Sequence, residues 1–212
     1  MSTHPRLALV GAYGSGKTTL STALSQLAGL PRTHGSPMIA PLGSSGRTIR
    51  DCTPPELLQM ITERYVERVV QETNLQDGFV SDGSVVHDWV YGMVRLAAGS
   101  YPDDGVHLSQ HDRDGDRDLY RAVLEQQGLL VRQHAAQAYD LFAFLPIEFP
   151  LAADNRPISE QFRVISDELL LETLRGLGVP TLVVRGSLRQ RLQRLATALD
   201  LPGLDAAVVA GV

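Results

Sequence analysis

Hydrophobic positions along this chain form two alternating patterns, which predict strands and helices in turn. Short apolar runs, typical of strands covered on both faces, occur at 7–10, 79–81, 140–146 and 180–186. Between them, apolar side chains recur every three or four residues and predict helices over 17–28, 54–73, 85–98 and 119–138 and after the capping residues Ser159 and Ser187. The alternation favours the α/β class, with one three-layer α/β/α domain over 1–212 and a parallel sheet of roughly five strands.

Two features interrupt this pattern. Residues 31–53 are rich in proline, glycine and serine, and only Met38-Ile39-Ala40 forms a candidate strand within them. This segment is either a substrate-facing loop or an ordinary surface excursion, and the sequence leaves both readings open. Gly128 is a potential break in the predicted helix 119–138, because glycine is a poor helix former.

The stretch between the first strand and the first helix carries the clearest chemistry. Gly11 to Thr19 fits G-x-x-x-x-G-K-[ST], the Walker A phosphate-binding loop. In this pattern glycines let the backbone curl around an anion, the lysine reaches the β- and γ-phosphates, and the hydroxyl after it ligates Mg²⁺. The alternative, a glycine turn that carries Lys-Thr by chance, is disfavoured by the strand-to-helix context. The predicted nucleotide-binding residues are Gly11, Tyr13, Gly14, Ser15, Gly16, Lys17, Thr18 and Thr19.

An acidic residue follows the second predicted strand. The run 79–81 ends in Asp82-Gly83-Ser84. Ligands of parallel α/β sheets bind at the carboxyl ends of the strands, so we expect Asp82 to lie beside the phosphate-binding loop. We therefore predict Lys17 as a catalytic residue, Thr18 as a magnesium ligand and Asp82 as a residue of the same site.

Composition and charge narrow the possible partners. The net charge of -5 argues against a general nucleic-acid binder, which needs a basic surface. The single cysteine, Cys52, excludes an internal disulfide. The first residues run directly into the first strand, and no apolar run approaches the roughly twenty residues of a membrane span. We expect a cytoplasmic protein that binds neither membranes nor nucleic acid, and the sequence leaves a homodimer open.

The order of these features resembles the P-loop kinases of nucleosides and nucleotides. It is most similar to the nicotinamide riboside kinase-like group, whose bacterial members are often labelled AAA-type ATPases, and the resemblance covers roughly 6–199. In those kinases the second strand commonly ends in Asp-Arg-Ser, followed by an aspartate and a tyrosine in the next helix. Here Asp82-Gly83-Ser84, Asp88 and Tyr91 match this order, with Gly83 in place of the usual arginine.

The resemblance implies roles for particular residues. Asp82 would hold Mg²⁺ or accept the proton of the phosphoryl acceptor. The loop at about 147–160 resembles the lid of the family, in which Arg156 would neutralise charge on the transferring phosphoryl group, with Arg163 as a second candidate. Arg185 lies in the turn that resembles the adenine-binding turn. The general base remains open among Asp82, Asp51 and Asp88.

The functional hypothesis is an ATP- and Mg²⁺-dependent kinase. Its acceptor would be a hydroxyl or phosphate of a small metabolite, either nucleoside-like or a specialised biosynthetic intermediate. Phosphoryl transfer mainly requires positioning and charge neutralisation, for which the loop, the metal and a lid arginine suffice. The alternative is a regulatory ATPase or nucleotide switch without a small-molecule acceptor. A GTPase is disfavoured because the sequence has no Asn-Lys-x-Asp motif.

Overall fold

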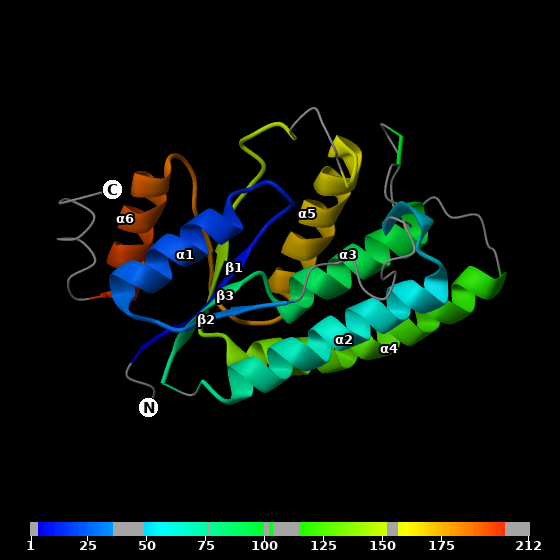
Figure 1. The fold of residues 1–212 in the computed structure, drawn as a ribbon, viewed down its shortest axis with the longest axis horizontal. Coiled ribbons are helices and arrows are strands. Elements are labelled where there is room, and N and C mark those ends of the chain that lie inside the picture. Colours follow the sequence, from blue (N-terminus) through cyan, green and yellow to red (C-terminus); the bar gives the residue numbers. More distant parts are fainter. Residues whose placement is uncertain are drawn as a thin grey trace.

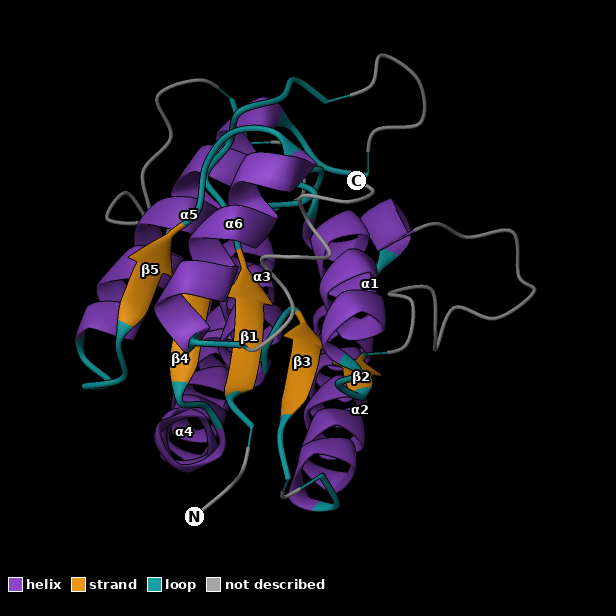
Figure 2. Cartoon of the chain, turned by 90° about the vertical axis from the view of Figure 1, so that its left-hand side faces the viewer, coloured by secondary structure: helices purple, strands orange, loops and turns teal. Residues whose placement is uncertain are grey.

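A parallel five-stranded sheet forms the centre of the computed structural model (Figures 1 and 2). The structure describes residues 4–35, 49–75, 77–99, 102–103, 115–151 and 157–201. Its elements are β1 (Arg6–Val10), α1 (Lys17–Ala28), β2 (Arg32–His34), a short 3-10 turn (Ile49–Asp51), α2 (Pro54–Thr73), β3 (Phe79–Asp82), α3 (Val85–Ala98), α4 (Gly115–Ala138), β4 (Leu141–Phe144), α5 (Glu160–Arg175), β5 (Thr181–Val183) and α6 (Leu188–Leu199).

The strand order β2-β3-β1-β4-β5 places β1 at the centre of the sheet. All neighbouring strands pair in parallel, and in Figure 2 the strand arrows point the same way. Leu9 of β1 is in register with Asp82 of β3. The loop that follows β1 and the end of β3 therefore meet at the same edge of the sheet, as the sequence predicts.

Alternate residues of β1 face two different helical layers. Leu7 and Leu9 belong to the hydrophobic core that α1 and α6 share with the sheet. Ala8 and Val10 belong to the larger core on the opposite face, which contains residues of α3, α4 and α5. Because side chains alternate across a strand, an unbroken apolar run can fill both cores at once. This explains the absence of a polar position in 7–10.

Helices α2, α3 and α4 form a third cluster outside the sheet, and Figure 1 shows them lying alongside one another. At Gly128 a Cβ atom would lie 2.8 Å from the Trp89 ring, so this glycine allows α4 to approach α3 closely. Helix α4 runs through Gly128 without interruption, and the predicted break is wrong. The structural role of the glycine is packing, which local propensity cannot reveal.

Most other predicted elements are confirmed. Helices α1, α2 and α3 have the predicted bounds, and Thr53 and Glu56 form the expected capping box. The sequence missed strand β2, which lies at Arg32–His34, and the candidate strand at 38–40 falls outside the described residues. None of the helices in the described ranges is long and apolar enough to cross a membrane.

Candidate active site

The phosphate-binding loop has a backbone shape that depends on its glycines. Gly11, Gly14 and Gly16 all have positive φ, at 139°, 77° and 91°. A Cβ atom at Gly11 would lie only 2.2 Å from the carbonyl oxygen of Leu145, so the loop could not pass there with a side chain. Gly16 is the N-cap of α1. The loop therefore leads into a helix N-terminus, whose backbone N–H groups favour a bound anion.

Side chains from the loop itself and from neighbouring helices hold this shape. The Lys17 ammonium donates to the carbonyl oxygens of Gly11, at 2.7 Å, and Ala12, at 2.9 Å. The Tyr13 N–H donates to the Tyr91 hydroxyl on α3. Arg191 of α6 donates to the carbonyl oxygen of Ser15 at 2.6 Å. Helices on both faces of the sheet therefore contact the loop.

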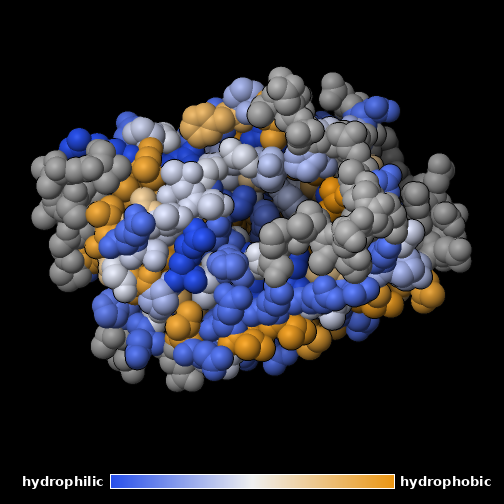
Figure 3. Space-filling view, viewed as in Figure 1, coloured by the Kyte–Doolittle hydropathy of each residue, from blue (hydrophilic) through white to orange (hydrophobic). Residues whose placement is uncertain are grey.

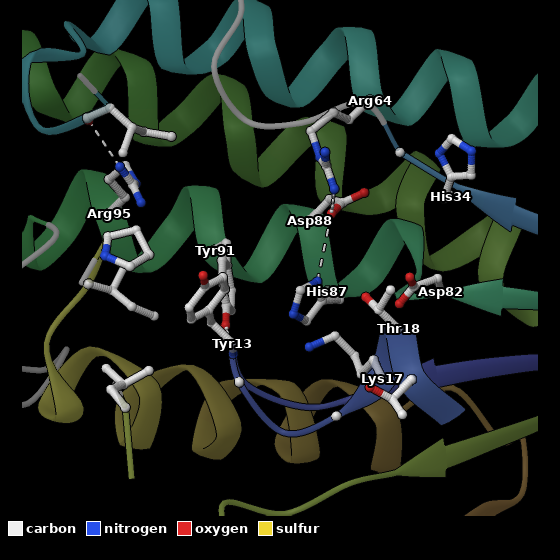
Figure 4. A pocket seen from close by; sticks show the side chains of 18 of the residues that line it. Tyr13, Lys17, Thr18, His34, Arg64, Asp82, His87, Asp88, Tyr91 and Arg95 are labelled. Atoms are coloured by element: carbon white, nitrogen blue, oxygen red, sulfur yellow. Dashed lines mark hydrogen bonds and ion pairs between the residues drawn. The ribbon is translucent and has the colours of Figure 1, made fainter. Parts of the chain in front are cut away.

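A cavity of about 960 Å³ opens in front of the loop. Figure 3 shows hydrophilic residues around a hollow in the face of the molecule that is turned to the viewer. Figure 4 shows side chains that line the cavity. The lining from the loop and α1 consists of Tyr13, Gly14, Gly16, Lys17, Thr18 and Thr19. The opposite walls include Asp82 of β3, His87, Asp88, Tyr91 and Arg95 of α3, and Arg64 and Arg68 of α2.

Asp82 lies beside the loop at the end of β3. It lines the same cavity as Lys17 and Thr18, and Figure 4 shows all three side chains there. The Asp82 carboxylate is 3.9 Å from Arg32. Burial is the main reason that the pKa of Lys17 falls to about 8, and the negative charge of Asp82 acts against this fall. Lys17 and Asp82 are thus brought together as predicted.

Thr18 and Asp82 fit a magnesium ion. A hydroxyl and a carboxylate are hard oxygen ligands, and Mg²⁺ usually adds water and substrate phosphates to one or two such groups. In the described ranges no cluster of three or more His, Cys, Asp or Glu side chains could form an all-protein metal cage. The donor set therefore suits a metal that arrives with a nucleotide.

Asp88, one of the alternatives for the general base, forms ion pairs with two arginines. Arg64 and Arg68 each place a guanidinium nitrogen 2.7 Å from a different Asp88 oxygen. Burial alone would raise the pKa of Asp88, but the two arginines outweigh it and hold the pKa well below the ordinary range. The geometry therefore disfavours Asp88 as a base. Asp51 is exposed and is not part of the described lining of the cavity.

Arg68 fills the space next to Gly83. It donates to the Ser81 hydroxyl and to the Asp82 carbonyl oxygen, and a Cβ atom at Gly83 would lie 2.8 Å from its Nη2 atom. Gly83 has a φ of 95°. An arginine from α2 thus stands beside the strand end at which the resemblance noted in the sequence leads us to expect one. No local sequence motif predicts that Arg68 lies at this site.

Helix α5 supplies two further polar residues near the loop. Arg163 is fully buried and donates from Nη1 to the carbonyl oxygen of Phe149 and to Glu160. Asp167, one turn later on the same face, interacts with the Ala12 N–H group, and burial raises its pKa to about 6. The sequence suggested Arg163 but missed Asp167, although the i,i+4 spacing from Arg163 was a usable signal.

Two further predicted residues, Arg156 and Arg185, are not among the described lining of this cavity. Arg156 falls outside the described residues. Arg185 is exposed and lines a second hollow of about 400 Å³ with Glu148, Gly186 and Arg194. Arg191 connects this hollow to the loop, because it pairs with Glu148 at 2.8 Å while it contacts Ser15.

Comparisons with known proteins agree with this architecture. The deoxyadenosine kinase of M. mycoides with bound dATP superposes with a TM-score of 0.64 at 15% identity, covering 92% of this chain and 99% of the other. Thymidylate kinase of Candida albicans gives 0.59 at 16% identity, covering 94% and 93%. NadR in complex with NAD and AMP-PNP gives 0.55 at 18% identity, covering 99% of this chain but 51% of NadR. No curated protein sequence matches the chain.

The fold is that of the P-loop nucleoside and nucleotide kinases. Within this class, a family model described as AAA domain matches residues 6–191, and the chain belongs to that family. The resemblance drawn from the sequence is confirmed at the level of fold and family.

Proposed function

We propose that this protein is an ATP- and Mg²⁺-dependent kinase that phosphorylates a small, nucleoside-like metabolite at a hydroxyl or phosphate group. The observation that carries this proposal is the shared cavity, in which the phosphate-binding loop and Asp82 face residues of α2 and α3. Its volume of about 960 Å³ is at the upper end of the roughly 300–1,000 Å³ of small-molecule sites, which suits two ligands. The fold of the compared kinases supports the same assignment.

The chemistry requires one bond to form and one to break. An oxygen of the acceptor bonds to the γ-phosphorus, the bond from that phosphorus to the β,γ-bridging oxygen breaks, and the acceptor proton leaves, with Asp82 as the candidate to receive it. Lys17 and the loop amides would neutralise the phosphate oxygens. Thr18 and Asp82 would hold Mg²⁺, which when bound neutralises charge on the β- and γ-phosphates.

An arginine near the γ-phosphate completes this scheme. Arg156 stays a prediction, and Arg163 is supported by its position. A Cβ atom at Gly14 would lie 3.8 Å from Arg163 Nη2, and neither Nη2 nor Nε has a hydrogen-bond partner within the described part of the chain. A buried guanidinium with unused donors beside a phosphate-binding loop suits a phosphate oxygen.

The test is a search for acceptor-dependent ADP release. The purified protein is incubated with Mg-ATP and a panel that contains deoxyadenosine, deoxycytidine, thymidine monophosphate and nicotinamide riboside, and products are identified by mass. A kinase releases ADP in proportion to a phosphorylated acceptor. ADP release that no acceptor stimulates would instead support the regulatory ATPase, and no nucleotide binding would reject both.

Lys17→Ala is the control variant. Without its ammonium group the γ-phosphate loses its main protein counter-charge, so we expect turnover to fall by roughly 10³-fold or more with circular dichroism unchanged. Normal turnover in Lys17→Ala would place the reaction at a different site.

A further inference from the structure

His87 occupies a fixed position in the wall of the cavity. It is the third residue of α3, and its N–H donates to the hydroxyl of the N-cap Ser84 at 3.0 Å. Its ring stacks at a tilt on Tyr91, with 4.4 Å between the ring centroids. The imidazole lies near Asp88 and the Lys17 ammonium, as Figure 4 shows. The backbone hydrogen bond to Ser84 and the contact with the Tyr91 ring therefore fix the position of the imidazole.

The imidazole nitrogens make no hydrogen bond within the described part of the chain, and Nε2 also lacks an ion pair there. His87 is only 8% exposed, yet neither ring nitrogen has a hydrogen-bond partner among the described residues. Nδ1 is 3.7 Å from Asp88, which is beyond hydrogen-bonding distance, and both Asp88 oxygens already accept from arginines. Buried polar atoms are nearly always paired in folded proteins. His87 lines the cavity, so an exception at this residue indicates a ligand atom.

The surrounding charges decide which kind of ligand atom fits. Burial, reinforced by the charge of Lys17, lowers the pKa of His87 to about 4, so the imidazole is neutral at pH 7. A neutral imidazole carries one N–H group and one lone pair. Because Nδ1 faces the Asp88 carboxylate, the hydrogen is favoured there, which leaves the lone pair on Nε2. This lone pair would repel a phosphate oxygen and attract an O–H group.

We propose that His87 Nε2 accepts a hydrogen bond from the reacting hydroxyl group of the acceptor and so turns that oxygen toward the γ-phosphate. This inference rests on the proposed kinase function and narrows it, because it selects a hydroxyl rather than a phosphate as the acceptor group. His87 orients the bound hydroxyl before transfer and does not keep its proton, since so weakly basic an imidazole is a poor base. As the acceptor oxygen bonds to phosphorus, the hydrogen turns from Nε2 to Asp82, which lines the same cavity.

The first test measures stability and needs no acceptor. His87→Phe keeps a flat ring against Tyr91 and removes two buried nitrogens that make no hydrogen bond among the described residues, so we expect the Tm of the ligand-free protein to stay unchanged or to rise by roughly 2–4 °C. His134→Phe is the matched control, because His134 Nε2 makes a 2.8 Å hydrogen bond to buried Glu72, and its Tm should fall. A lower Tm for His87→Phe would overturn the proposal, since it would indicate a structural role.

The second test measures transfer to an acceptor. With deoxyadenosine, deoxycytidine and nicotinamide riboside as hydroxyl probes, we expect His87→Phe to lower kcat/KM for the acceptor roughly 10- to 100-fold, with ATP affinity within about twofold of the wild type. His87→Gln, whose amide oxygen can take the place of Nε2, should recover part of the loss.

The outcomes separate the two proposals. If the wild type phosphorylates none of the panel, the proposed function fails, and this inference fails with it. If the wild type is active but His87→Phe is equally active, only the role of His87 is rejected. Phosphorylation of thymidine monophosphate alone would also reject it, because that acceptor reacts through a phosphate oxygen.

Discussion

At the scale of single residues, two aspartates that look equivalent in the sequence differ in their ion pairs. Asp82 and Asp88 lie six positions apart and both line the cavity. Asp88 is neutralised by Arg64 and Arg68 at 2.7 Å, whereas Asp82 pairs with Arg32 only at 3.9 Å. An ion pair at 3.9 Å near the surface is weak. Asp82 is therefore the carboxylate that remains available to a metal or to a proton.

Replacing Asp82 with asparagine tests this assignment. The amide keeps the shape but loses the charge that would bind Mg²⁺ or receive the proton, so we expect kcat to fall by about 10²- to 10⁴-fold. ATP affinity, which depends mainly on the loop, should change by less than about tenfold. Steady-state kinetics and nucleotide titration measure the two quantities separately. Unchanged kcat would refute the role of Asp82.

At the scale of elements, helix α5 contacts the phosphate-binding loop through the side chain of Asp167. Asp167 interacts with the Ala12 N–H group and lies near Lys17 and Arg163. Its Oδ1 atom has no hydrogen-bond partner in the described part of the chain. Burial raises the pKa of Asp167 from 3.8 to about 6 despite these favourable contacts. The native state thus holds this charge at a cost in stability above pH 6.

This cost predicts a stabilising substitution. Between about pH 4 and pH 6 the native protein binds a proton at Asp167 that the unfolded chain has released, so this group lowers the free energy of unfolding as pH rises. Asp167→Asn removes the charge and keeps an oxygen for the Ala12 N–H group. We expect it to be more stable than the wild type at pH 7.5, by up to about 3 kcal/mol, with the difference vanishing near pH 4.

Urea unfolding at pH 4 and pH 7.5 measures this difference. Glu168→Gln, the neighbouring substitution on α5, serves as a control for the loss of one acidic group. A destabilised Asp167→Asn at pH 7.5 would mean that the contacts of the carboxylate outweigh its burial.

At the scale of the whole molecule, the loop joins parts of the protein that pack in different cores. It contacts Tyr91 of α3, which belongs to the larger core, and Arg191 of α6, which lies on the other face of the sheet. A ligand that tightens the loop therefore acts on both helical layers at once. Binding to the native state alone raises the free energy of unfolding.

Mg-ATP should consequently stabilise the entire domain. At a concentration of 100 Kd the gain is about 2.7 kcal/mol, which corresponds to a rise in Tm of roughly 5–10 °C for a protein of this size. Thermal unfolding with Mg-ATP, with ATP and EDTA, and with Lys17→Ala measures the effect. The shift should be largest in the first case and absent in the last. An equal shift in Lys17→Ala would contradict the proposed nucleotide site.

The sequence by itself determined what local chemistry specifies. The strand-to-helix context of Gly11 to Thr19 identifies the loop, and the caps and apolar periodicities place α1, α2 and α3, because these signals involve residues a few positions apart. Asp82 followed from a general rule about strand ends, which parallel pairing makes reliable.

Only the tertiary structure decided which distant residues meet. Arg68 stands against Gly83, Asp167 against Ala12, and Gly128 against Trp89, and each pair joins different elements. Strand β2 is three residues long, too short for its own periodicity, and is defined by its pairing with β3. Contacts between elements depend on packing distances and burial, which leave no periodic trace in the sequence, so the wall of the cavity that faces the loop had to be found in the fold.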